Sequence, residues 1–212
     1  SAIVAYTYDN QDGAIGKIIG ATEDVAAGGR SGIVKTIDPF GNWTEYETIN
    51  TYTITANGQA KVLTSQSKLI AFFNIDTSTL IQTAIPEVTY HYDSVTGVIT
   101  GATETGSGKL KTTDVFGNQT EYETINTYEL QRNGQVKVLT TKSVLLNSSN
   151  IDGSTLEQTQ IPILTYLYDP VTGVITGATE DQSGRLKTTD IFGNWTEYET
   201  QNEYTLTANG QA

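Results

Sequence analysis

The architecture of this chain follows from one stretch, Gln119–Leu139, which reads QTEYETINTYELQRNGQVKVL. On both sides of Asn133-Gly134, β-branched and aromatic residues alternate with polar ones, which is the pattern of two strands joined by a tight turn. Asn-Gly is the preferred pair for a type I′ turn, because both residues there take positive φ. The stretch therefore predicts a β-hairpin with strands Gln119–Leu130 and Gln135–Ser148.

The turn also predicts which residues face each other across the hairpin. Counting outward from Asn133-Gly134 pairs Tyr128 with Leu139 and Tyr122 with Leu145. The same count from the earlier Asn57-Gly58 gives the pairs Tyr52/Leu63, Tyr46/Leu69, Trp43/Phe72 and Glu47/Lys68. Tyrosine and leucine share one face in both hairpins, so we expect that face to form the core. A strand with Val88-Tyr90-Tyr92 on one face, and its copies at Val4-Tyr6-Tyr8 and Leu164-Tyr166-Tyr168, should add to it.

The hairpin belongs to a repeat. Phe-Gly-Asn recurs at Phe40, Phe116 and Phe192 with a constant period (116 − 40 = 192 − 116 = 76), and residues 40–60 match 192–212 at 18 of 21 positions. We divide the chain into repeats 1–79, 80–155 and 156–212. The first carries two insertions that map to loops, and the third lacks its last strand, so we expect a longer array or a strand from another copy to complete it.

Each repeat is expected to contain four strands. In the second repeat the first two are Leu80–Asp93, with Pro86 as a bend or edge device, and Val98–Asp114, interrupted at Thr105–Gly108. No segment has a helical pattern. The predicted fold is all-β: a long antiparallel meander of stacked 76-residue repeats, a spiralling β-solenoid-like ribbon, with eleven strands in this chain.

Composition excludes several classes of function. The net charge of −12 argues against nucleic acid as a partner, since phosphate binding needs a basic surface. There is no cysteine and only one histidine, His91, so disulfides, thiolate chemistry and most metal clusters are excluded. No run of 18 or more apolar residues and no basic leader occurs, so we expect neither a membrane span nor an uncleaved signal peptide.

Three motifs of the third repeat, Tyr168-Asp169, the segment 184–190 (GRLKTTD) and the segment 193–198 (GNWTEY), resemble the YD (Rhs) repeat. The resemblance returns at Tyr92-Asp93 and, more loosely, at Tyr8-Asp9. It implies a long antiparallel ribbon that spirals, as in large bacterial surface or secreted proteins, including shells that enclose toxins. YD units recur at a much shorter spacing than the period of this chain.

Candidate sites are few. The carboxylate pairs Glu45/Glu47, Glu121/Glu123 and Glu197/Glu199 could be imagined as acid and base, but they read more simply as a solvated acidic stripe. Residues 9–13 and 150–153 combine Asx residues with glycine, which suits calcium and, first of all, turns. Acceptor sequons place glycan attachment at Asn42, Asn118 and Asn194. His91 is expected to be exposed and inert, and Trp43 and Trp195 to be packing aromatics rather than sugar platforms.

The expected function is structural: a repeat section of an extracellular or cell-surface fibre, stalk or adhesin, with no catalytic residue, cofactor or metal. Its expected partners are further copies of itself or adjoining repeats of a longer chain. A carbohydrate-binding repeat module and part of a toxin-enclosing shell remain the alternatives, and exposed tryptophans in a groove would favour the first of them.

Overall fold

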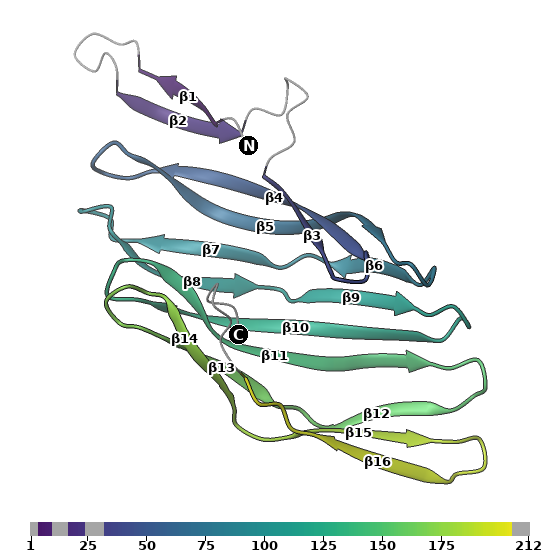
Figure 1. The fold of residues 1–212 in the computed structure, drawn as a ribbon. Coiled ribbons are helices and arrows are strands. Elements are labelled where there is room, and N and C mark those ends of the chain that lie inside the picture. Colours follow the sequence, from purple (N-terminus) through teal and green to yellow (C-terminus); the bar gives the residue numbers. More distant parts are fainter. Residues whose placement is uncertain (1–3, 10–16, 24–31, 205–212) are drawn as a thin grey trace. The chain divides into compact units, whose positions relative to one another are not determined.

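The computed structural model describes residues 4–9, 17–23 and 32–204. These residues form sixteen strands and no helix, so the all-β prediction is confirmed. The chain divides into two units, of which unit 1 comprises residues 1–72 and 85–106, and unit 2 comprises residues 73–84 and 107–212. Each unit contains open antiparallel sheets (Figure 1).

Unit 1 contains a hairpin and a five-stranded sheet. The hairpin joins β1 (Val4–Tyr8) to β2 (Ile18–Glu23). The sheet consists, in spatial order, of β3 (Ile33–Ile37), β4 (Trp43–Ile54), β5 (Ala60–Phe73), β7 (Glu87–Tyr92) and β8 (Ile99–Thr105). The two insertions expected in the first repeat fall in residues 10–16 and 24–31, outside the described residues.

Unit 2 contains two sheets. The larger consists, in spatial order, of β14 (Ile175–Glu180), β13 (Ile163–Tyr168), β11 (Val136–Ser149), β10 (Gln119–Leu130), β9 (Gly108–Thr113) and β6 (Thr79–Ala84). The smaller consists of β12 (Thr155–Gln160), β15 (Gly184–Thr189) and β16 (Trp195–Thr200), in that order.

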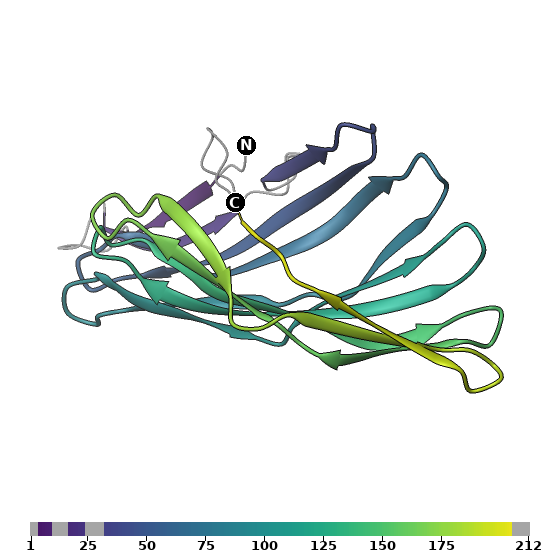
Figure 2. The same cartoon turned by 60° about the horizontal axis from the view of Figure 1, so that its bottom comes forward.

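The predicted hairpin of the second repeat is present as β10 and β11, which run side by side (Figure 2). Strand β10 spans the predicted Gln119–Leu130, and Tyr122 lies opposite Leu145 as predicted. The pairing of Tyr128 with Leu139 is wrong: Tyr128 faces Val138, because the loop that joins the strands has three residues (132–134) where the count assumed two. A bulge between Tyr128 and Thr127 then inserts one extra residue without ending the ladder, and it restores the counted register for the residues farther from the turn. In the first repeat, the Thr51 and Thr64 hydroxyls lie 2.7 Å apart between β4 and β5.

The predicted type I′ turn is also wrong. Gln131 N–H donates to the Gln135 carbonyl and Gly134 N–H donates to the Gln131 carbonyl, which closes a three-residue loop. Gly134 has φ +79°, whereas Asn133 is not among the residues with positive φ. This is the loop in which a type I turn is followed by a left-handed glycine that forms a bulge.

Asparagine is needed in this turn for its side chain. Asn133 Nδ2 donates to the Thr172 carbonyl at 2.8 Å, and Asn57 Nδ2 donates to the Thr96 carbonyl at 3.2 Å. The acceptor lies 39 residues further along the chain in both cases. Each of these two Asn-Gly turns therefore docks on the tip of the next hairpin.

The first two strands of the repeat are each divided in two, so the expected count of eleven long strands is wrong. The first breaks at Ile85-Pro86 into β6 and β7, where proline cannot donate to a ladder, as the bend predicted at Pro86 requires. The second breaks into β8 and β9 where glycines had predicted an interruption.

These breaks change the order of neighbours. Strand β11 pairs with β13, whereas β12 leaves it and pairs with β15. Between β11 and β12, the side-chain amide of Gln158 replaces the missing backbone hydrogen bonds. Leu145 N–H donates to Gln158 Oε1 at 2.7 Å, and Gln158 Nε2 donates to the Ser143 carbonyl at 3.1 Å. Neighbours do not simply follow one another in sequence order.

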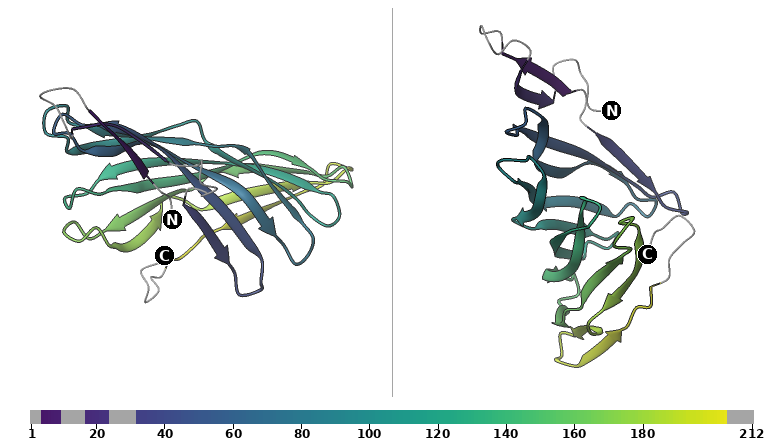
Figure 3. Two further views of the ribbon diagram at one scale, coloured as in Figure 1. Left: turned by 90° about the horizontal axis from the view of Figure 1, so that it is seen from above. Right: turned by 90° about the vertical axis from the view of Figure 1, so that its left-hand side faces the viewer.

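The expected core is absent from the described residues. None of their hydrophobic side chains is buried, and only Gln131 among the polar ones is. Tyr46 and Tyr122 are half-buried, while Tyr6 and Tyr8 are 48% and 49% exposed. The strands of each sheet form a single layer (Figure 3), and no described hydrophobic side chain is buried against it. The prediction of a buried Tyr/Leu core is therefore wrong for this part of the chain.

The Tyr-Asp motif ties strands together locally. The hydroxyl of Tyr92 donates to the Val62 carbonyl and that of Tyr168 to the Val138 carbonyl, both at 2.7 Å. Burial raises the pKa of both tyrosines. The aspartate that follows, Asp93, accepts from the Thr96 N–H at 2.7 Å and so closes the next turn.

One turn holds strain that its copy avoids. Thr77 has φ +66°, although β-branched residues rarely adopt the left-handed region, and the equivalent residue of the next repeat is Gly153, with φ +77°. Both donate through N–H to an asparagine carbonyl at 3.0 Å, so the two turns have the same hydrogen bond.

Thr77→Gly is therefore expected to raise the free energy of unfolding by about 0.5–1 kcal/mol, since relief of left-handed strain outweighs the entropy cost of glycine. Urea denaturation followed by circular dichroism measures it. Gly153→Thr is the reciprocal control and should lower the stability. A loss of stability in Thr77→Gly would contradict the assigned turn.

Candidate functional site

Three hairpins, β3–β4, β9–β10 and β15–β16, are closed by one kind of turn. It spans Asp38–Asn42, Asp114–Asn118 and Asp190–Asn194. The aspartate Oδ1 accepts from the backbone N–H of the phenylalanine and of the asparagine at 2.8–3.0 Å. Asparagine Nδ2 donates to Oδ2 of the same aspartate at 2.8–2.9 Å. These bonds, led by that of the asparagine side chain, lower the pKa of each aspartate.

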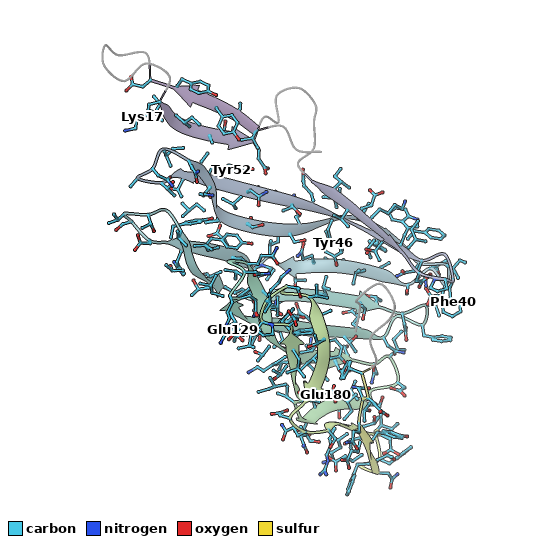
Figure 4. The ribbon with its side chains drawn as sticks, turned by 60° about the vertical axis from the view of Figure 1, so that its left-hand side comes forward. Lys17, Phe40, Tyr46, Tyr52, Glu129 and Glu180 are labelled. Carbon is cyan, nitrogen blue, oxygen red and sulfur yellow. The ribbon has the colours of Figure 1, made fainter. Side chains whose placement is uncertain are left out.

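The three asparagines of these turns, Asn42, Asn118 and Asn194, are the residues predicted to carry glycans. Each closes its turn with the atom to which a glycan would be joined. The structural role of these asparagines is therefore established by geometry, and their modification stays a prediction. Phe40 stands at the tip of the first turn, where it is 78% exposed (Figure 4).

The paired glutamates lie on one face of a charged ladder. Cross-strand ion pairs join Lys35 to Glu45 at 3.4 Å, Lys109 to Glu123 at 3.8 Å and Arg185 to Glu199 at 3.4 Å. The cations come from the strand that precedes the glutamates, not from the one that follows, where Lys68 was expected to pair. Pairs of this kind on an open face contribute about 0–1 kcal/mol each and keep a sheet soluble. The arrangement is that of a solvated ladder.

The same six residues, WTEYET, occur in two environments. As Trp43–Thr48 they belong to β4, lie between β3 and β5, and are all half-buried. As Trp195–Thr200 they form β16, which has only β15 beside it among the described strands, and all six are exposed. Trp195 is 63% exposed and Tyr198 is 61% exposed.

A lysine lies over each tryptophan. Lys35 Nζ is 3.6 Å from the centre of the Trp43 ring, and Lys187 Nζ is 5.3 Å from the centre of the Trp195 ring. Trp43 is thus a packing residue, as predicted. Trp195 is not packed to the same degree, because β15 is the only described strand that pairs with its own.

A cluster of glutamate, asparagine and tyrosine escaped the sequence analysis. In unit 2, Glu180 Oε1 accepts from Asn202 Nδ2 at 2.9 Å and from the Tyr204 hydroxyl at 2.6 Å. These residues line a groove of about 580 Å³, and burial, together with the bond to Glu180, raises the pKa of Tyr204 to about 12. Figure 4 labels Glu180 within β14.

The cluster has a counterpart in unit 1. Glu23 Oε1 accepts from Asn50 Nδ2 at 2.8 Å and from the Tyr52 hydroxyl at 3.3 Å. The sequence contains a signal from which this cluster could have been predicted. An Asn-x-Tyr motif occurs at residues 50–52, 126–128 and 202–204, and a Thr-Glu dipeptide precedes it in every repeat. This cluster links Glu23, the last residue of β2, to side chains of β4, so its role is architectural.

Residues 150–153, one of the two segments whose composition suits calcium or a turn, form a turn. Asp152 Oδ1 accepts from the Ser154 N–H and hydroxyl at 2.9 and 2.7 Å, and Asn150 Nδ2 donates to Ser154 Oγ at 3.0 Å. The other loop considered, residues 9–13, lies outside the described residues except for Asp9. Across residues 4–9, 17–23 and 32–204, no three histidine, aspartate or glutamate side chains gather in a way that could hold a metal ion.

His91 is exposed as predicted, with Nε2 at 2.9 Å from the Thr103 hydroxyl.

The chain matches no known protein family, no curated protein and no solved structure. In the described part of the chain there is no helix with the length and hydrophobicity needed to cross a membrane.

Proposed function

We propose that this chain is a structural repeat section of an extracellular fibre, stalk or adhesin and does no catalysis. One observation carries the proposal: the same hydrogen-bonded turn closes a hairpin once in every repeat, with the same atoms paired. Selection for an enzyme site would favour one unique cluster, whereas selection for length favours copies of one unit.

The proposal includes the arrangement of the repeats. Segments 1–79, 80–155 and 156–212 would be successive units of one antiparallel ribbon, stacked so that each unit presents its strands to the next. The resemblance to the YD repeat supports such a ribbon, and so do the hydrogen bonds from Asn57 and Asn133 to the next hairpin. Shells that enclose toxins are a special case of the same architecture.

The test is a chain in which residues 80–155 are duplicated in tandem. If the divided strands β6/β7 and β8/β9 each occupy one position of the ribbon, the added repeat supplies four positions of about 4.8 Å each and should lengthen the particle by about 19 Å. Small-angle scattering and electron microscopy of the parent and extended chains measure this. Separate globules joined by a flexible segment, or an extended chain no longer than the parent, would refute a continuous ribbon.

A second candidate is carbohydrate binding, and the exposure of Trp195 favours it, since an exposed indole offers a face on which a sugar ring can stack. Binding on a glycan array that is lost in Trp195→Ala and kept in Trp43→Ala would support this function. If no glycan on the array binds, carbohydrate binding is refuted and Trp195 is expected to contact protein instead.

A further inference from the structure

We propose that Asn57 is a site of spontaneous deamidation, and that its conversion to aspartate or isoaspartate releases the β4–β5 turn from the tip of the β7–β8 hairpin in unit 1. Asn133, the same residue of the next repeat, is held more firmly and reacts more slowly. The inference goes beyond the structural role proposed above and does not depend on it, since it concerns one residue and the turn that holds it.

The reaction needs only the chain and water. Glycine has no side chain to hinder its backbone nitrogen, so an asparagine that precedes glycine is the most reactive kind. The Gly58 nitrogen attacks Asn57 Cγ and forms an N–Cγ bond, while the Cγ–Nδ2 bond breaks. The proton of the attacking nitrogen passes through solvent to the departing amide, which leaves as ammonia. Water then opens the cyclic imide at either carbonyl and gives aspartate or isoaspartate.

In the folded chain the turn must open before the reaction can occur. Gly58 N–H donates to the Thr55 carbonyl at 2.8 Å, and Asn57 Nδ2 donates to the Thr96 carbonyl. The attacking nitrogen and the leaving amide are therefore both engaged while the turn is closed. The rate of deamidation then depends on the fraction of time that the turn is open, as hydrogen exchange does.

The hydrogen bonds of the Asn57 amide are longer than those of its copy. Nδ2 lies 3.2 Å from the Thr96 carbonyl, and the Gln59 N–H donates to Oδ1 at 3.3 Å. The corresponding two bonds of Asn133 are 2.8 and 3.0 Å. The Thr55 hydroxyl also donates to Asn57 Oδ1, but this bond lies within the turn and does not tie it to the next hairpin. Longer bonds of the same kind are weaker, so the first turn is held less firmly.

The packing beneath the two turns differs in the same direction. A groove of about 430 Å³ is lined by Thr55 from the first turn and by Asp93 and Ser94 from the hairpin tip on which the turn docks. In the next repeat the place of Thr55 is taken by Gln131 (55 + 76 = 131), which is buried with 9% of its surface exposed, whereas Thr55 is half-buried. The second turn is thus anchored by a buried side chain, and the first borders an open groove.

Exposure does not distinguish the two asparagines, because both side chains are exposed and water reaches both. The difference in reactivity therefore comes from how often each turn opens. Three observations agree that Asn57 opens more often: its longer bonds to the next hairpin, the groove beside its turn, and the absence of a buried anchor such as Gln131.

Deamidation would undo the docking of the turn. An aspartate side chain has no N–H to donate, so two acceptors would face each other at the Thr96 carbonyl. The new carboxylate would also place a second negative charge beside the groove that Asp93 lines. Isoaspartate adds a methylene to the backbone and changes the length of the turn as well. The turn at residue 57 and the hairpin tip at residues 93–98 would then separate.

The experiment follows the full 212-residue chain over time at mildly alkaline pH. Peptide mapping by mass spectrometry, with fragmentation that separates isoaspartate from aspartate, gives the rate at Asn57 and at Asn133. The same measurement in concentrated guanidinium chloride gives the rates without structure, and each folded rate is divided by its denatured rate. We expect this ratio to be at least about threefold higher for Asn57 than for Asn133, because its turn opens more often.

A reciprocal pair of variants tests the anchor. Thr55→Gln gives the first turn the residue of the second and should slow the reaction at Asn57, whereas Gln131→Thr should speed it at Asn133. Equal folded-to-denatured ratios at the two asparagines of the unmodified chain, or a higher ratio at Asn133, would overturn the assignment of Asn57 as the reactive site.

Asn57→Asp tests the consequence. Hydrogen exchange should become faster in residues 95–98 and stay unchanged in residues 171–174, which have the same sequence, VTGV, and serve as the matched control. Unchanged exchange at residues 95–98 would refute the release of the turn. An equal acceleration in both segments would refute it too, since the effect would then be a general loss of stability.

Discussion

Gly97→Ala is expected to destabilise unit 1 by about 2–5 kcal/mol. Gly97 has φ +68°, where an L residue costs about 1–2 kcal/mol. An added Cβ would also lie 2.9 Å from the Cβ of Thr55 and 3.1 Å from Asn57 Oδ1. The Thr55 Cβ is held by the backbone of its own turn, so the two hairpin tips would have to separate, at a further cost of about 1–3 kcal/mol.

Gly58→Ala is the matched control for this change. Gly58 has φ +77°, but a Cβ there would meet nothing within 4 Å. It should therefore cost only the backbone strain, about 1–2 kcal/mol. Urea unfolding monitored by Trp43 fluorescence, in a Trp195→Phe background, measures both. Equal losses in the two variants would mean that the Asn57 turn and the Gly97 turn do not touch in solution.

Tyr46→Ala and Tyr198→Ala change the same residue of the same hexapeptide, and we expect very different results. Tyr46 is half-buried, and burial raises its pKa. A fully buried large side chain costs about 3–5 kcal/mol when cut to alanine, so about 2 kcal/mol is expected for Tyr46. Tyr198 is 61% exposed and should cost about 0.5 kcal/mol or less, as exposed positions usually do.

Thermal and urea unfolding of both variants give the comparison, and Glu47→Ala, which removes a carboxylate next to Tyr46 in sequence, controls for a general loss of strand propensity. Similar losses in Tyr46→Ala and Tyr198→Ala would show that β16 is covered in solution as β4 is.

Local signals in the sequence determined where the strands lie. The bounds of β10 follow from alternation and turn residues alone, and the break at Pro86 follows from the missing N–H of proline. The role of Asn42 and its copies in closing a turn also follows from residues no more than four positions apart. Such features depend on neighbours in sequence, so a sequence can predict them.

The cross-strand details depended on more than distance from a turn. Tyr128 does not face Leu139, because the loop has three residues rather than two, and Tyr122 faces Leu145 as counted only because a bulge between Tyr128 and Thr127 restores the register. The partners of the paired glutamates came from the preceding strand rather than the following one. The count from a turn assumes a regular ladder and names only one of the two strands that flank a central strand.

Burial was decided by the tertiary structure alone. A pattern of alternating Tyr and Leu specifies which residues share a face, but whether that face becomes a core depends on a second layer, which the described residues do not supply. The docking of Asn57 on Thr96, 39 residues away, and the two fates of WTEYET in β4 and β16 are likewise set by strands distant in sequence. Identical residues differ in exposure there because burial is a property of the neighbours that assemble around a strand, and these are not encoded within the strand itself.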